Sequence, residues 1–161
     1  MRRGATRLVL WTAVALAAAA VAPPLEPLDG ALARPGEALA AGVAVGVALF
    51  ACLARRPLPV AALGRASRPR LAARSALLAV KSAQEEAVWR GVVLGSLAVV
   101  VGRAGALAAS SVLFAVAHVP RQRSRAVVQL ATGTAFGLVY VTTGRLLAAI
   151  AAHTAYNLLV G

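Results

Sequence analysis

The side chains of this chain that could do chemistry are concentrated in its second half, inside apolar segments. Two adjacent carboxylates, Glu85 and Glu86, lie in one such segment, and the histidines His118 and His153 lie in two others. Asn157, the only asparagine, follows His153. Carboxylates and imidazoles are common general acids and bases. Because ionisable groups inside apolar helices are costly, we interpret this set first as functional.

The spacing of these residues strengthens that interpretation. Three pairs stand four residues apart and so share a helical face: Glu86 with Arg90, Phe114 with His118, and His153 with Asn157. We expect the first pair to be a structural ion pair that orients its neighbour, because an acid four residues before a base is the favoured order. Phe114 is expected to support packing. The plain alternative for each histidine is a hydrogen bond to a backbone carbonyl.

The composition predicts that membrane helices position these groups. Hydrophobic residues make up 60% of the 161, only 14% are charged, and the mean hydropathy is +0.79. Such a composition suits a chain whose helices face lipid. We therefore predict an all-α, polytopic transmembrane helical bundle of about six spans. The apolar segments are residues 8–22, 38–54, 76–101, 104–119, 126–143 and 146–160.

The loop charges predict the orientation. With a cytoplasmic N-terminus, thirteen basic residues lie inside and three outside, which satisfies the positive-inside rule. The inner ones are Arg2, Arg3, Arg7, Arg55, Arg56, Arg65, Arg68, Arg70, Arg74, Lys81, Arg121, Arg123 and Arg125, and the outer ones are Arg34, Arg103 and Arg145. Both termini would then be cytoplasmic. The dominance of Ala and Arg favours a GC-rich bacterial genome, and hence the bacterial inner membrane.

Other features of the chain narrow the alternatives. The net charge of +12 comes from loop arginines that anionic lipid attracts, so we expect no nucleic-acid partner. The first segment also fits a secretory signal, although Pro23 is a poor residue after a cleavage site, and a retained helix is expected. Three Gly-x-x-x-Gly motifs, Gly42/Gly46, Gly91/Gly95 and Gly133/Gly137, predict close helix packing.

The predicted topology brings the reactive groups to similar depths. Glu85 lies roughly 13 Å from the inner surface and His153 roughly 12 Å from it, at about 1.5 Å of rise per residue. His118 is at the inner end of its helix. We expect all three to converge in the cytoplasmic half of the bundle. Residues 1–74 would form two N-terminal helices with a basic cytoplasmic loop, and residues 75–161 a catalytic four-helix core.

These residues carry a resemblance to a known family. The stretches Glu85-Glu86-Ala-Val-Trp-Arg90-Gly91, Phe114-Ala-Val-Ala-His118 and His153-Thr-Ala-Tyr-Asn157 resemble, in order and approximate spacing, the three motifs of the CPBP intramembrane proteases. That family is also called Abi and includes the type II CAAX prenyl endopeptidases. The likeness runs from about Ser75 to the C-terminus. Trp89 stands where the family usually has Phe.

The resemblance implies peptide-bond hydrolysis within the membrane. Glu85 would be the general base that deprotonates water, His118 would help to hold that water, and His153 and Asn157 would stabilise the oxyanion. Glu86, Arg90 and Phe114 would support them. A metal is the alternative, with Glu85, His118 and His153 as zinc ligands. However, no His-x-x-x-His element is present, so a mechanism without a cofactor is favoured.

The expected partner is a membrane-anchored protein or peptide substrate. Bacterial relatives of the family include immunity proteins and the myxosortases, short enzymes thought to cut C-terminal anchor helices, and the small size of this chain fits the latter. An active site in the cytoplasmic half of the membrane is poorly placed to release a substrate protein at the outer face. The competing classes are a non-proteolytic immunity or scaffold protein and a proton-coupled carrier, although the inverted repeats of a carrier are not evident. The sequence indicates no oligomeric state.

Overall fold

The described part of the chain is built from helices. The computed structural model describes residues 13–14, 17, 34–54 and 67–160, so the predicted first segment, residues 8–22, lies mostly outside the described residues. The all-α prediction is confirmed, and segments 126–143 and 146–160 coincide with observed helices. The elements are α2 (Pro35–Ala54), α4 (Arg68–Glu86), the π-helix η1 (Ala87–Leu94), α5 (Gly95–Gln122), the 3-10 turn η2 (Arg123–Arg125), α6 (Ala126–Thr143) and α7 (Leu146–Val160).

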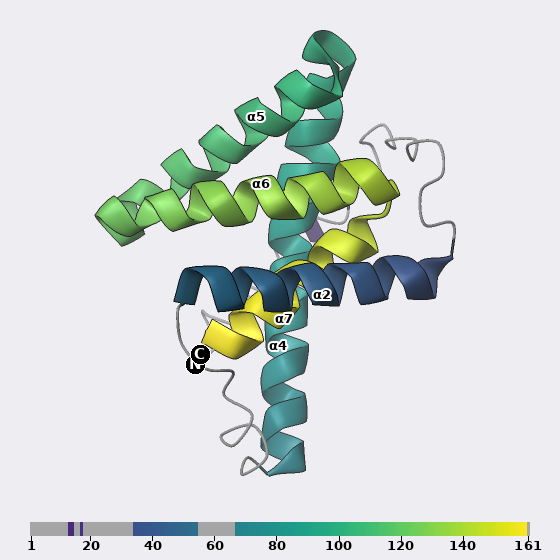
Figure 1. The fold of residues 1–161 in the computed structure, drawn as a ribbon, viewed down its shortest axis with the longest axis vertical. Coiled ribbons are helices and arrows are strands. Elements are labelled where there is room, and N and C mark those ends of the chain that lie inside the picture. The colour runs from purple at the N-terminus through teal and green to yellow at the C-terminus, as the bar shows by residue number, and fades with distance from the viewer. Residues whose placement is uncertain (1–12, 15–16, 18–33, 55–66, 161) are drawn as a thin grey trace.

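One long helical rod forms the axis of the molecule. α4 continues through η1 into the first part of α5, along the longest dimension in Figure 1. α5 then turns back sharply at Gly102, whose φ of 72° and ψ of 168° are not helical. Only glycine adopts such a φ readily. The predicted segments 76–101 and 104–119 fall within the two limbs on either side of a one-residue turn. The first limb begins at Arg68, eight residues before the predicted segment, so the end of the predicted basic loop is helical.

The end of α5 lies further along the chain than predicted. The sequence predicted that the helix would stop at Val119, before Pro120, but it continues to Gln122. Proline removes only one backbone donor. The last turn is still closed by the Arg123 N–H, which donates to the carbonyl of Val119. The chain then leaves the helix at Arg123, which has a φ of 50°.

Glycines let the helices approach closely, as predicted for the motifs Gly42/Gly46 and Gly133/Gly137. α7 packs mainly against α2, and a Cβ atom added at Gly42 or Gly46 would run into the backbone carbonyl oxygen of Ala148 or Ala152, respectively. On α6, a Cβ at Gly133 would lie 3.0 Å from the ring of Phe114. The contacts of Gly42 and Gly46 hold α7, which carries His153, at a fixed position beside α2.

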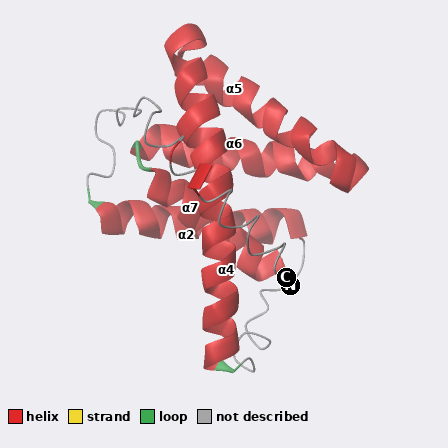
Figure 2. Cartoon of the chain, turned by 180° about the vertical axis from the view of Figure 1, so that it is seen from behind, coloured by secondary structure: helices red, strands yellow, loops and turns green. Residues whose placement is uncertain are grey.

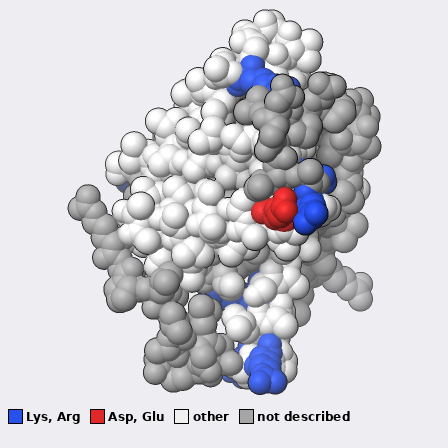
Figure 3. Space-filling model, turned by 45° about the vertical axis from the view of Figure 1, so that its right-hand side comes forward, with Lys and Arg blue, Asp and Glu red and all other residues white. Residues whose placement is uncertain are grey.

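The outer surface of the bundle is apolar. Three helices of the described part are long and apolar enough to cross a membrane, Pro35–Ala54, Arg68–Gln122 and Ala126–Thr143, and the shorter Leu146–Val160 is also apolar. The second of these contains the turn at Gly102, and the view from behind in Figure 2 shows its two limbs. On the face in Figure 3, charged side chains are few. The fold fits a helical membrane bundle, while the count of six spans stays a prediction.

Candidate active site

The two glutamates stand where the helix changes its winding. α4 ends at Glu86, and the π-helix η1 begins at the next residue. In a π-helix the backbone bonds run to the fifth residue, as in the bond from the Gly95 N–H to the Arg90 carbonyl. Such segments are rare and are found frequently at functional sites. η1 therefore sets the directions in which the residues after Glu86 point.

Glu86 is the polar centre of the site. Its side chain is fully buried. One carboxylate oxygen, Oε1, lies 2.7 Å from Nδ1 of His153, and the other, Oε2, lies 3.0 Å from Nε of Arg90. The structure thus shows the predicted ion pair, and it adds a bond to α7 that ties the first motif to the third. A buried carboxylate with two such partners is held in one orientation.

Arg90 extends this connection to α5 and α6. Its Nη2 donates to the Gly133 carbonyl at 2.8 Å. Its guanidinium lies over the ring of Phe114, 4.8 Å from the centroid, so a cation–π contact adds to the packing role expected for Phe114. Only 1% of Arg90 is exposed. Arg90, which lies on η1, therefore connects α4, α5 and α6 around Glu86.

His153 faces both glutamates. Its ring stacks on Phe136, with centroids 4.8 Å apart and planes 22° apart, which fixes the orientation of the imidazole. While Nδ1 contacts Glu86, Nε2 lies 3.8 Å from Oε2 of Glu85. Unlike Glu86, the Glu85 side chain is 45% exposed. The 3.8 Å between Nε2 of His153 and Oε2 of Glu85 is too long for a direct hydrogen bond. An oxygen atom of a ligand placed beside the line between these two atoms can contact both of them.

His118 joins the site indirectly. Its Nδ1 lies 2.8 Å from the backbone carbonyl of Phe114, the arrangement that sequence reasoning named as the plain alternative. Its ring is tilted against the Phe114 ring at 4.5 Å, and Phe114 in turn contacts Arg90. Within the described residues, His118 forms no ion pair with Glu85. The predicted convergence is thus observed for Glu85 and His153, while His118 is connected to them through Phe114 and Arg90.

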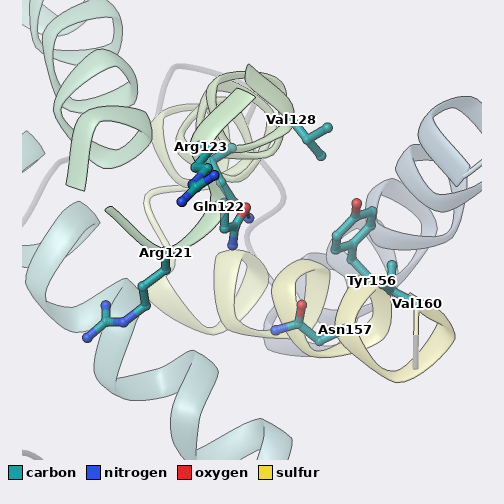
Figure 4. A pocket seen from close by; sticks show the side chains of 8 residues that line it. Arg121, Gln122, Arg123, Val128, Tyr156, Asn157 and Val160 are labelled. Carbon is teal, nitrogen blue, oxygen red and sulfur yellow. Dashed lines mark hydrogen bonds between the residues drawn. The ribbon is translucent and has the colours of Figure 1, made fainter. Parts of the chain in front are cut away.

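Asn157 lies one helical turn beyond His153, in the wall of a cleft of about 570 Å³. Figure 4 shows Tyr156, Asn157 and Val160 on α7, with Gln122 facing them from the end of α5. An amide in this position is accessible to a ligand in the cleft. Neither Glu85 nor His153 lines this cleft, so Asn157 is related to them through its position one turn along α7 from His153.

The alternative zinc site requires three ligands in one place. Among the residues that the structure describes, no group of three His, Cys, Asp or Glu side chains is arranged to hold a metal ion. Glu85 and His153 are close, but the contacts of His118 are with Phe114.

Sequence reasoning missed three contributors to the site: the π-helix η1, Phe136 against His153, and the Gly133 carbonyl that binds Arg90. The motif Gly133/Gly137 was a usable signal for the last two, since it marked the face of α6 that packs closely. Nothing in the sequence signalled the change of helical winding.

Comparison with known proteins identifies the family. A family model described as "Type II CAAX prenyl endopeptidase Rce1-like" matches residues 69–159. The chain belongs to this Rce1-like family. The match confirms the resemblance seen in the sequence, and it covers all the motif residues that meet around Glu86. No curated protein and no solved structure matches. Membership of the Rce1-like family implies a membrane protein with CAAX-type intramembrane protease activity.

Proposed function

We propose that this Rce1-like protein is an endopeptidase of the bacterial cytoplasmic membrane, with both termini inside, that cuts a membrane-anchored protein. The observation that carries the proposal is the pairing of a partly exposed Glu85 carboxylate with a buried His153 imidazole, 3.8 Å apart, in a member of a protease family. An accessible carboxylate is needed to activate water. An oriented imidazole is needed next to the reacting carbonyl.

In the proposed reaction, Glu85 is the general base. A water beside its carboxylate loses a proton to Glu85 as the water oxygen attacks the substrate carbonyl. The carbonyl oxygen becomes an oxyanion, and the protonated Glu85 then gives its proton to the departing amine. His118 lies against Phe114 rather than beside Glu85, so it would support the site through Phe114 and Arg90.

His153 and Asn157 would stabilise the oxyanion. Nδ1 of His153 bonds to the Glu86 carboxylate, so Nε2 can donate to an oxyanion only from a doubly protonated ring. The Asn157 amide, one turn away, supplies a second donor. Fixed donors of this kind are typically among the largest contributions to catalysis.

We propose that the reaction needs no metal, because the residues of the alternative zinc site do not gather around one point. The substrate we favour is a protein anchored by a C-terminal helix, as for the myxosortases. An immunity or scaffold protein would use the same fold without cleavage, and the experiment below distinguishes the two.

The test is cleavage in proteoliposomes. The purified protein is reconstituted with candidate anchored proteins, and the products are identified by mass spectrometry. Glu85→Gln should lower kcat by about 10²–10⁴-fold, the usual contribution of a general base. Glu37→Gln is the matched control, because Glu37 lies in the first turn of α2, paired with Arg34. Cleavage by Glu85→Gln at the wild-type rate would rule out the proposed base.

A further inference from the structure

Three polar side chains outside the family motifs form a bridge across the turn between α5 and α6. Nε2 of Gln129, near the start of α6, donates to Oε1 of Gln122, the last residue of α5, at 3.0 Å. The hydroxyl of Thr132, about one turn further along α6, donates to Oε1 of Gln129 at 3.1 Å. The Gln129 amide thus both donates and accepts. We call Gln122, Gln129 and Thr132 the polar bridge.

The polar bridge spans a strained piece of backbone. Arg123, which directly follows Gln122, has a φ of 50° and a ψ of −124°. A residue with a Cβ atom keeps such a conformation only where its surroundings fix it. The bond between Gln129 and Gln122 joins the helix ends on either side of this turn. It is therefore a contact that can hold the turn in one conformation.

The inner end of the polar bridge lies next to the carbonyl that Arg90 binds. Only 1% of Thr132 is exposed, and a hydroxyl buried to this extent needs a hydrogen-bond partner, which Gln129 provides. The next residue is Gly133, whose carbonyl accepts a bond from Nη2 of Arg90 at 2.8 Å. Because neighbouring residues of a helix move together, a contact that fixes Thr132 also fixes the Gly133 carbonyl.

The packing around Gly133 makes the position of α6 matter for Arg90. A Cβ atom at Gly133 would lie 3.0 Å from the Phe114 ring, so the backbone of α6 packs closely against that ring. The Arg90 guanidinium lies over the same ring, 4.8 Å from its centroid. Densely packed interiors transmit displacements from one group to the next. A shift of α6 would therefore disturb two contacts of Arg90, which in turn holds Glu86.

We propose that Gln129 and Thr132 are positioning residues that hold the Gly133 carbonyl against Arg90 and so keep the Glu86–His153 contact in its productive geometry. The hydrogen bonds of the two side chains lie within the polar bridge and to the Gln129 carbonyl, so both residues act on the reacting groups through Arg90. The effect on cleavage rests on the proposed protease function. The effect on packing can be measured without a substrate.

The first experiment measures cleavage by full-length variants in proteoliposomes, below the melting temperature of each variant. Gln129→Met removes both side-chain bonds of the amide, and Thr132→Val replaces the hydroxyl by a methyl group. We expect each to lower kcat by about 10–10²-fold, as small misplacements of catalytic groups do. Thr132 does not line the cleft beside Asn157, so the KM of Thr132→Val should stay near the wild-type value. Thr132→Ser keeps the hydroxyl and should recover most of kcat.

The matched control is Thr134→Val, on the same face-exposed helix α6. The Thr134 hydroxyl is exposed and donates to the Leu130 carbonyl at 2.8 Å, so this variant should keep the wild-type kcat. An equal loss of kcat in Thr134→Val and Thr132→Val would contradict a specific role for the polar bridge.

The route through Arg90 is tested in an Arg90→Lys background. Lysine keeps a positive charge beside Glu86 but lacks the planar guanidinium that binds the Gly133 carbonyl. Adding Thr132→Val should then lower kcat little further, because the contact that Thr132 supports is already lost. If Thr132→Val lowers kcat as much in this background as in the wild type, Thr132 does not act through Arg90 and the proposal is overturned.

The second experiment needs no substrate. The Trp89 ring meets the Phe114 ring edge-on, with centroids 5.5 Å apart, so its fluorescence reports the packing of Phe114. With Trp11→Phe in every protein, Trp89 is the only tryptophan. We expect Thr132→Val to shift the emission maximum of Trp89, and Thr134→Val to leave it unchanged.

Together the two experiments separate this proposal from the protease assignment. Wild-type kcat and wild-type emission in Thr132→Val would overturn the positioning role. An emission shift with no fall in kcat would also contradict it, since the contacts of Arg90 would then not govern the reaction. If the emission shifts but no candidate protein is ever cut, the protease assignment fails, while the polar bridge still fixes the packing around Phe114.

Discussion

Replacement of Glu86 by glutamine tests the central contact of the site. Glutamine keeps the shape of the side chain but removes its negative charge. The buried guanidinium of Arg90 would then keep only the Gly133 carbonyl and the face of the Phe114 ring as strong partners. Breaking a buried ion pair from one side typically costs about 3–5 kcal/mol, which corresponds to about 10²–10⁴-fold in the unfolding equilibrium.

Arg90 provides the second half of a double-mutant cycle. Arg90→Gln leaves the buried Glu86 carboxylate with the His153 imidazole as its remaining polar partner, so it should destabilise the fold by a similar amount. In the double variant neither charge is left alone, so we expect its loss of stability to be smaller than the sum of the two single losses. Activity should not recover with stability, because Nδ1 of His153 has lost its charged partner.

Stability can be measured by reversible unfolding with SDS in mixed micelles, followed by far-UV circular dichroism, and activity by the cleavage assay. Glu37→Gln is the control, since its exposed pair with Arg34, 3.9 Å long, should contribute at most about 0.5 kcal/mol. If both single variants unfold like the wild type and their effects simply add, the idea that this ion pair holds the site together is refuted.

Three further predictions concern the surroundings of the site. Gly46→Ala should lower the free energy of unfolding by about 1–3 kcal/mol and lower activity, because the new Cβ meets the Ala152 carbonyl next to His153. Gly36→Ala, which has open space around it, should change neither. Equal melting temperatures for the two variants would contradict the close packing. Phe136→Leu should keep the fold largely intact yet lower kcat, since the ring that stacks on His153 is gone, and an unchanged kcat would show that this stacking is dispensable. Treatment with 1,10-phenanthroline, compared with its non-chelating 1,7-isomer, should leave cleavage unaffected; selective inhibition reversed by zinc would favour the metal mechanism.

Much of this protein could be predicted from local sequence. The helices follow from runs of apolar residues, and the bounds of α6 and α7 were predicted correctly because Gly144, with a φ of 64°, separates two continuous apolar stretches. The Glu86–Arg90 pair was predictable because both residues lie within one turn of the same chain segment. The family motifs are likewise short and local, which is why they were recognisable before any fold was known.

The tertiary structure decided which groups meet. Whether His118 or His153 faces Glu85 depends on how α5 and α7 are rotated about their own axes, and that rotation is set by contacts between distant segments, such as Gly46 against Ala152 and Arg90 against Gly133. The π-helix that begins after Glu86 changes the direction of every later side chain in the rod. A sequence determines spacing along each helix, but only packing between helices determines the faces that they turn toward one another.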